Sequence, residues 1–244
     1  MGGGGSKGKA LLHRVAQHLG VENPETNQRS LLAAMPLSED EKTQLAAEYL
    51  RPAQPVGWKE DPDMWLDSNN IRDVMRQYEE SRPDFKFLGP YPIDFASPDP
   101  YTKSKGGQDR CYIGEMCSLN LKQEQAAGKK YVGIVYNLDP HYKGGSHWVA
   151  NFIDIPKKHC YYFDSYGMKP PKQIHKFMQW LTLQEPKMQL GMNGRQFQRQ
   201  DTECGVYCLY FLDRMLAGEP YLKFVRSSPS DKFMLDLRDW FYST

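Results

Sequence analysis

The 244-residue sequence lacks any run of 18 apolar residues, the length at which a membrane-spanning helix is predicted. Its start also lacks the charged and then apolar profile of a secretory signal, so we expect a chain that is not secreted. The charge is nearly balanced, with 31 basic and 30 acidic residues. A chain with so little net charge is not expected to bind nucleic acid strongly, except through a local basic patch such as Lys129-Lys130. What remains is a globular chain, 40% apolar, that is long enough to bury a core.

Cysteine is scarce, and its spacing matches neither a disulfide framework nor a CxxC metal pair. The five cysteines are Cys111, Cys117, Cys160, Cys204 and Cys208. An odd number without framework spacing favours free thiols in a reducing, intracellular compartment. The adjacent His159 and Cys160 would point to opposite faces of a strand and would make a poor zinc site. We therefore expect no metal and no other cofactor.

The first six residues, Met1-Gly-Gly-Gly-Gly-Ser6, permit two interpretations. They match the pattern for myristoylation at Gly2, and Lys7 and Lys9 would add weak attraction to an anionic membrane. They also match a flexible tail or an artificial linker, which we favour because so short a motif often occurs by chance. Membrane contact is expected only if Gly2 is myristoylated.

Residues 1–60 are predicted to form a helical extension before a main domain at residues 61–244. Apolar residues recur at helical spacing over residues 9–19. A second helix is expected to begin at Ser38, with a capping box to the glutamate three residues on, and to stop at Pro52.

The start of the main domain is predicted to be helical and then irregular. The helix places four apolar residues on one face, Ile71, Val74, Met75 and Tyr78. Residues 89–108 contain four prolines and predict a long irregular loop.

The second half of the chain alternates between β-prone runs and amphipathic helices. Strands are expected over residues 131–136, 147–155 and 160–164, and helices over 172–183, 203–216 and from Ser230, the last with Phe233, Leu237, Trp240 and Phe241 on one face. The second and third strands form a hairpin signal. This pattern predicts an α+β fold with a mixed, mainly antiparallel central sheet flanked by helices.

Cys204 lies in the first turn of one of these helices, which Asp201 or Thr202 is expected to cap. A free thiol has a pKa of about 8.5, and the partial positive charge at a helix N-terminus favours the thiolate. The adjacent Gly205 would let a substrate backbone approach closely. The alternative is a buried structural cysteine, which fits Cys208, one turn later, better than Cys204.

His147 opens one strand of the predicted hairpin and Asp164 ends the other. Antiparallel pairing would bring both residues to the same end of the sheet. A carboxylate there can accept the imidazole Nδ1–H and leave Nε2 to face a thiol. Separately, each residue also fits an ordinary surface role, a partly exposed histidine and an aspartate that starts a turn. Spacing alone leaves a triad with Cys204 as one of two interpretations.

Four segments resemble the cysteine proteases that process SUMO-like modifiers and the adenovirus-type maturation proteases. They are Trp65-Leu-Asp-Ser68, Gly145-Ser-His-Trp148, Tyr162-Phe-Asp-Ser-Tyr-Gly167, and Gln198 followed six residues later by Cys204-Gly205. The order His, Asp, Gln, Cys along the chain matches that family and opposes the papain order. The resemblance covers roughly residues 63–216 and is greatest to the maturation proteases of large DNA viruses, of the African swine fever virus type.

The resemblance implies a role for each residue of the constellation. His147 would be the general base, Asp164 its orienting acid and Cys204 the nucleophile, with the nucleophile at the N-terminus of its helix. Gln198 would donate to the oxyanion together with the Cys204 backbone N–H, although Gln196 and Gln200 are nearby alternatives.

The same resemblance places Trp148, Trp65 and Gly205 in the substrate cleft, where Trp148 is equally compatible with a core position. The chain departs from SUMO proteases after the glutamine, where Arg199-Gln-Asp201 replaces an Asn-Gly pair. This departure puts modifier recognition in doubt more than it does the chemistry.

The family implies cleavage of peptide bonds after small residues, often Gly-Gly-X, and in a virus the substrates would be capsid or core precursors. Three alternatives stay open: a protease of SUMO- or ubiquitin-like modifiers, an acetyltransferase that uses the same Cys/His/acid set, and a non-catalytic scaffold. The expected partner is a protein substrate. We expect a monomer in the host cytoplasm or a viral factory, or packaged in the virion.

Overall fold

The structure is a computed structural model and describes residues 13, 16–17, 28–99, 111–227 and 229–243. Its elements are, in chain order, α2 (Gln28–Ala34), α3 (Glu39–Tyr49), the 3-10 helix η1 (Val56–Lys59), α4 (Ser68–Ser81), β1 (Phe85–Pro92), α5 (Gly114–Cys117), α6 (Leu121–Ala126), β2 (Tyr131–Asn137), β3 (Trp148–Asp154), β4 (His159–Phe163), α7 (Lys172–Gln184), β5 (Gln189–Met192), α8 (Cys204–Leu216), α9 (Tyr221–Phe224) and α10 (Asp231–Phe241). The helix expected over residues 9–19 falls mostly outside the described residues, as does the glycine-rich start.

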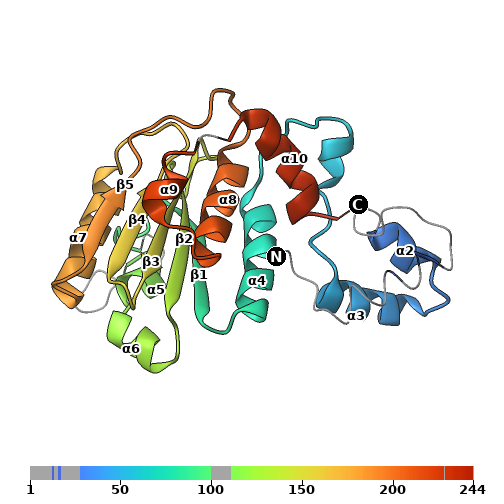
Figure 1. The fold of residues 1–244 in the computed structure, drawn as a ribbon, viewed down its shortest axis with the longest axis horizontal. Coiled ribbons are helices and arrows are strands. Elements are labelled where there is room, and N and C mark those ends of the chain that lie inside the picture. The colour runs from blue at the N-terminus through green and yellow to red at the C-terminus, as the bar shows by residue number, and fades with distance from the viewer. Residues whose placement is uncertain (1–12, 14–15, 18–27, 100–110, 228, 244) are drawn as a thin grey trace.

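The five strands form one mixed sheet in the order β1-β2-β3-β4-β5 (Figure 1). β3 pairs antiparallel with β2 and with β4, whereas β1 and β5 add parallel at the two edges. All seven residues of β3 are buried because helices cover both faces of the sheet. α4 and α8 pack on one face, and α7 packs on the other. The predicted α+β class and the predicted hairpin are both confirmed.

α2 and α3 lie at one end of the molecule and form a small helical unit (Figure 1). α2 and α3 share a separate apolar cluster that includes Leu31, Leu32 and Leu50. The capping box at Ser38 is present, as predicted. The guanidinium of Arg51 donates to the carbonyl of Trp240 at 2.9 Å, so this unit is joined to α10. None of the helices in the described part of the chain has the length and apolar character needed to cross a membrane.

The prediction of an irregular loop over residues 89–108 is wrong at its start, because residues 89–92 belong to β1. β1 is an edge strand, and its pairing with β2 shifts register between Leu88 and Tyr91. Proline lacks a backbone N–H and is tolerated at such an edge, so Pro90 and Pro92 do not prevent strand formation. The proline content alone therefore predicted a loop where the chain forms an edge strand.

The final helix, α10, begins at Asp231 with Ser230 as its N-cap, one residue after the predicted start, but its buried face differs from the predicted one. Met234, Arg238 and Phe241 are buried, whereas Phe233 and Trp240 remain 42% and 44% exposed. Arg238 therefore faces inward, whereas Phe233 and Trp240, which the apolar spacing placed on the buried face, are partly exposed. The short strand β5 and the short helices α5, α6 and α9 were not predicted, because four to six residues carry too little periodicity to be recognised.

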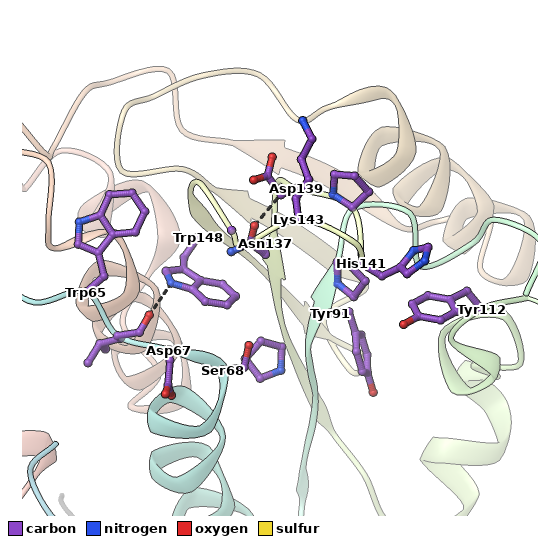
Figure 2. Close-up of a pocket in the computed structure, with 16 residues that line it drawn as sticks. Trp65, Asp67, Ser68, Tyr91, Tyr112, Asn137, Asp139, His141, Lys143 and Trp148 are labelled. Carbon is purple, nitrogen blue, oxygen red and sulfur yellow. Dashed lines mark hydrogen bonds between the residues drawn. The ribbon is translucent and has the colours of Figure 1, made fainter. Parts of the chain in front are cut away.

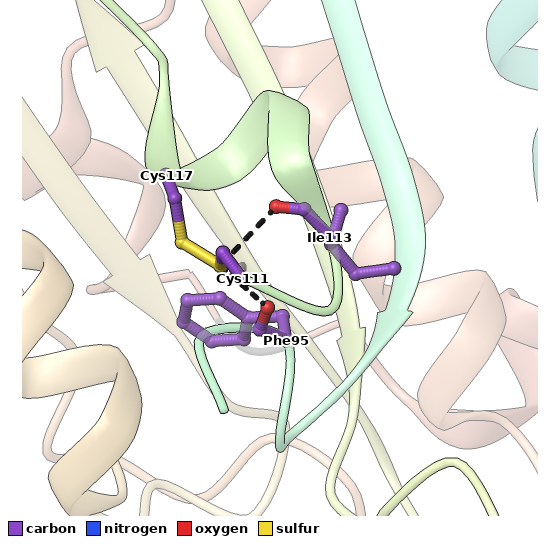
Figure 3. Close-up of a disulfide and its surroundings, with 4 residues drawn as sticks. All are labelled: Phe95, Cys111, Ile113 and Cys117. Atoms are coloured by element: carbon purple, nitrogen blue, oxygen red, sulfur yellow. Dashed lines mark hydrogen bonds between the residues drawn. A yellow bond between two sulfur atoms is a disulfide. The ribbon is translucent and has the colours of Figure 1, made fainter. Parts of the chain in front are cut away.

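The expectation that all cysteines are free thiols is also wrong for one pair. Cys111 and Cys117 form a disulfide beside Phe95, with 6.3 Å between their Cα atoms (Figure 3). The short helix α5 folds the chain back between them, so their separation falls within the range that a disulfide requires. A six-residue spacing gave no sign of this turn. Cys160, Cys204 and Cys208 are free and buried.

Candidate active site

The β3–β4 hairpin places His147 and Asp164 at the same end of the sheet. Ala150 pairs with Phe163 in the antiparallel register, so the residue before β3 and the residue after β4 meet there. The Nε2 atom of His147 lies 2.8 Å from Oδ1 of Asp164. The structure thus brings this predicted pair into direct contact.

The orientation of the His147 ring is opposite to the predicted one. Nε2, not Nδ1, contacts Asp164. The Cys204 side chain also interacts with this ring, and because Nε2 faces Asp164, Nδ1 is the nitrogen that remains for it. The hairpin spacing specified the shared end of the sheet, but the direction of approach of α8 decided which nitrogen meets the thiol.

His147 holds its proton more tightly than an ordinary histidine. Burial lowers its pKa, but the interactions with Asp164 and Cys204 raise it by a larger amount. The resulting pKa is about 9. The imidazole is therefore largely protonated at neutral pH. An imidazolium next to a thiol favours the thiolate, the form of cysteine that acts as a nucleophile.

Asp164 is buried and held by its backbone as well as by its side chain. The Oδ1 atom of Asn193 accepts the Asp164 N–H at 2.9 Å, and the Asn193 Nδ2 donates to the Asp164 carbonyl at 2.6 Å. The Tyr166 N–H donates to Oδ1 of Asp164 at 2.8 Å. Gly167 follows at φ +73°, where a Cβ would lie 2.7 Å from the backbone of Arg195. Asn193 was missed from the sequence because nothing about an isolated asparagine in a loop predicts this contact.

Cys204 is the first residue of α8 and is 1% exposed. The prediction that Asp201 or Thr202 caps this helix is wrong: Glu203 is the N-cap residue, and no side chain among the described residues caps the helix. Backbone N–H groups at an uncapped helix start have no partner within the helix and can bind an anion. The missing cap therefore suits a nucleophile that must become negatively charged.

The other free cysteines have the character of core residues. Cys160 and Cys208 are fully buried, and burial raises the pKa of both thiols. They remain protonated at neutral pH. The interpretation of Cys208 as a structural cysteine agrees with this placement.

Gln198 is fully buried, whereas its sequence rivals Gln196 and Gln200 are exposed. Its Oε1 accepts a hydrogen bond from the Ser165 hydroxyl at 2.7 Å, and its Nε2 donates to the Gln200 carbonyl at 2.7 Å. These two bonds fix which end of the amide carries the N–H groups. Among the three glutamines, burial and orientation favour Gln198 as the donor.

A buried ion pair lies directly before Cys204 and was not predicted. The Arg238 side chain binds Glu203 through Nη2, and its Nε lies 3.2 Å from Oε2 of Glu203. Arg238 also stacks on the Trp58 ring at 4.5 Å and donates to the Pro62 carbonyl at 2.6 Å. Burial raises the pKa of Glu203, and the ion pair opposes that rise. The negative charge beside Cys204 is thereby matched by a cation from α10.

A cleft of about 380 Å³ extends from the two predicted tryptophans (Figure 2). Trp148 is buried, and its Nε1–H donates to the Leu66 carbonyl at 2.9 Å, whereas Trp65 is 41% exposed. Gly205 is not among the residues that line this cleft. A Cβ there would lie 3.0 Å from the Cβ of Leu66, so the glycine makes room for the segment that supports Trp148. No cluster of three potential metal ligands occurs within the described ranges.

Comparison with known proteins gives three kinds of match. The model of the Ulp1 protease family, C-terminal catalytic domain, matches residues 94–239. The chain is 33% identical over 176 residues to R355 of Acanthamoeba polyphaga mimivirus, which is named as a thiol protease, covering 68% of this chain and 52% of that protein. It is 32% identical over 114 residues to the cysteine protease S273R of African swine fever virus, covering 43% of this chain and 41% of that protein. The chain thus spans about half the length of the curated relatives it matches.

Solved structures share the fold. The crystal structure of the African swine fever virus pS273R protease aligns with a TM-score of 0.68 at 19% identity, over 96% of this chain and 90% of that one. The C-terminal Ulp1 protease domain, solved in complex with Smt3, aligns with a TM-score of 0.55 at 17% identity, over 91% and 93%. Together the matches confirm the resemblance seen in the sequence.

Proposed function

The chain belongs to the Ulp1 protease family, and we propose on that basis that it is a cysteine endopeptidase that cleaves peptide bonds after small residues, in Gly-Gly-X sequences. The sequence predicted a cysteine endopeptidase, and this is the enzyme class of the family. One observation carries the proposal: the His147 ring lies between the Asp164 carboxylate and the Cys204 thiol at the start of α8.

The first chemical step follows from this arrangement. Because the His147 ring holds its proton at neutral pH, the proton of the Cys204 thiol already lies on Nδ1 before the attack, and Asp164 stabilises this imidazolium through Nε2. The thiolate attacks the carbonyl carbon of the scissile bond, and the carbonyl oxygen becomes an oxyanion. The Cys204 backbone N–H at the uncapped helix start is one donor to it.

Gln198 supplies the second donor to the oxyanion. An amide nitrogen carries two hydrogens, and the one given to Gln200 leaves another for the oxyanion. His147 then returns its proton to the leaving amine, and the peptide bond breaks to leave a thioester on Cys204. Water attacks the thioester with His147 as the base, which releases the new carboxyl end and restores the thiol.

The two tryptophans support the preference for small residues. Trp148 is held in place by the Leu66 carbonyl, and Trp65 lines the same cleft (Figure 2). A side chain larger than that of glycine would have to displace an indole fixed by packing and a hydrogen bond. A steric clash of this kind is one way in which a site rejects larger residues.

The proposed substrates are capsid or core precursors of a large DNA virus. The viral origin of the relatives R355 and S273R supports this choice. The second candidate is a modifier protease, because S273R is named a SUMO-1 cysteine protease in several virus isolates. The segment Arg199-Gln-Asp201, which replaces the Asn-Gly pair of SUMO proteases, favours the first candidate.

One experiment separates these candidates. The purified chain is offered Gly-Gly-X peptides, SUMO and ubiquitin fusions, and acetyl-CoA with an acceptor peptide, with Cys204→Ala as the control. Cleavage of the short peptides without cleavage of the fusions supports the maturation role. Cleavage of the fusions alone selects the modifier protease. Acetyl transfer, or no Cys204-dependent reaction at all, contradicts the proposal.

A further inference from the structure

Tyr166 makes a ring contact with His147 that the proposed chemistry does not use. The two rings are stacked, with centroids 4.8 Å apart and planes inclined by 27°. The backbone N–H of Tyr166 also donates to Oδ1 of Asp164, the same oxygen that pairs with His147. One residue therefore limits both the tilt of the imidazole and the position of its carboxylate partner.

The hydroxyl of Tyr166 reaches the segment that precedes the nucleophile. It lies 3.3 Å from the Gln200 carbonyl and 3.5 Å from Oδ1 of Asp201. The Gln200 carbonyl also accepts the Nε2–H of Gln198 at 2.7 Å. The ring that covers the histidine is thus linked, through one carbonyl oxygen, to the glutamine of the oxyanion site.

The groups around His147 favour the charged form of its ring. The titratable groups that the structure places against His147 are Asp164 and Tyr166, from the segment after β4, and Cys204, from α8. Asp164 attracts the charged imidazolium, and the face of an aromatic ring attracts a cation as well.

We propose that Tyr166 is a positioning residue that holds the His147 ring in line between Asp164 and Cys204 and, through its hydroxyl, fixes the Gln200 carbonyl that orients Gln198. It acts through these residues and does not itself react. The proposal rests on the roles assigned to His147 and Cys204, but on no particular substrate.

The test measures the ring of His147 directly. Proton–carbon NMR of the imidazole, assigned with His147→Gln, reports the protonation midpoint without any need for peptide cleavage. Tyr166→Leu removes the aromatic face and should lower the midpoint by about 0.5 pH unit. Tyr166→Trp provides a stronger aromatic face and should raise it. Tyr166→Phe keeps the stack and should leave the midpoint unchanged.

Kinetics test the hydroxyl separately. Tyr166→Phe should lower kcat several-fold with little change in KM, because the Gln200 carbonyl is no longer held. Tyr131→Leu is the matched control, since Tyr131 is a half-buried tyrosine that stacks on Phe152 at the opposite end of the sheet. It should change neither the midpoint nor kcat.

Two results would overturn the proposal. An unchanged midpoint in Tyr166→Leu and Tyr166→Trp would mean that the ring only covers the site, and if the leucine variant does not fold, the tryptophan variant alone decides this. An unchanged kcat in Tyr166→Phe would show that the contact between the Tyr166 hydroxyl and the Gln200 carbonyl does not orient Gln198. If the wild-type chain cleaves no peptide, the proposed function fails, but the NMR comparison still decides the role of the ring.

Discussion

The hydroxyl of Ser165 donates a hydrogen bond of 2.7 Å to Oε1 of Gln198. Ser165 lies between Asp164, which binds the histidine, and Tyr166, which stacks on it. Three consecutive residues after β4 therefore hold His147, the proposed base, and Gln198, the proposed oxyanion donor, together. This link explains how a loop residue far from the hairpin in sequence is held next to it.

Ser165→Ala should loosen the orientation of the Gln198 amide. The lost hydrogen bond has a net value of about 0.5–1.5 kcal/mol, so we expect kcat to fall about 2- to 10-fold with KM nearly unchanged. Steady-state kinetics on a Gly-Gly-X peptide measures this. Ser118→Ala, at an exposed serine in the turn after α5, is the control and should behave as the wild type. A kcat equal to the wild-type value would show that the amide is oriented without Ser165.

Gln198→Ala should have a larger effect, because it removes the proposed oxyanion donor itself. Loss of one such donor costs about 2.7–4 kcal/mol of transition-state stabilisation, which corresponds to a decrease in kcat of about 10²- to 10³-fold. Gln200→Ala is the matched control, since Gln200 contributes its carbonyl and its side chain is exposed. Equal losses in the two variants would contradict the choice of Gln198.

Alkylation mapped by mass spectrometry should modify Cys204 before the other free cysteines. Its thiol contacts His147, whereas burial raises the pKa of Cys160 and Cys208 and keeps them protonated. Cys204→Ala should abolish turnover, and Cys160→Ala should retain it. Preferential labelling of Cys208, or activity in Cys204→Ala, would contradict the assignment of the nucleophile.

The raised pKa of His147, about 9, predicts two pH effects of known sign. The imidazolium must protonate the leaving amine, so kcat/KM should fall as the pH rises through about 9. The ordinary pKa of 6.5 lies lower, so folding stabilises the charged form, and this contribution to stability is complete below about pH 6.5 and lost toward pH 9.

Urea denaturation of the wild type and of His147→Gln at several pH values measures the second effect. The wild-type advantage in the free energy of unfolding should shrink between about pH 6.5 and pH 9. An advantage that grows over that range would show that the imidazole is neutral in the folded chain.

Arg238→Met should be strongly destabilising, because it leaves the buried Glu203 carboxylate without its cation. Breaking a buried pair from one side typically costs about 3–5 kcal/mol. Chemical denaturation measures the loss, and the double variant Glu203→Gln with Arg238→Met should recover part of it, since no unpaired charge remains. A double variant less stable than Arg238→Met would mean that Glu203 has another essential partner.

Local sequence patterns predicted the features whose physical cause is local. The apolar spacing of Ile71, Val74, Met75 and Tyr78 defines the buried face of α4, and the capping box at Ser38 requires only residues within one helical turn. The shared end of the hairpin, with His147 and Asp164, follows from the antiparallel pairing of adjacent strands.

The tertiary structure decided everything that depends on the direction in which distant segments meet. The approach of α8 determines that Nδ1 of His147, and not Nε2, meets Cys204. Packing against Leu66 gives Gly205 a structural role, and the position of α10 places Arg238 beside Glu203. A sequence specifies which side chains are available, but hydrogen bonds and ion pairs act over about 3 Å, and only the folded chain determines which groups come within that range.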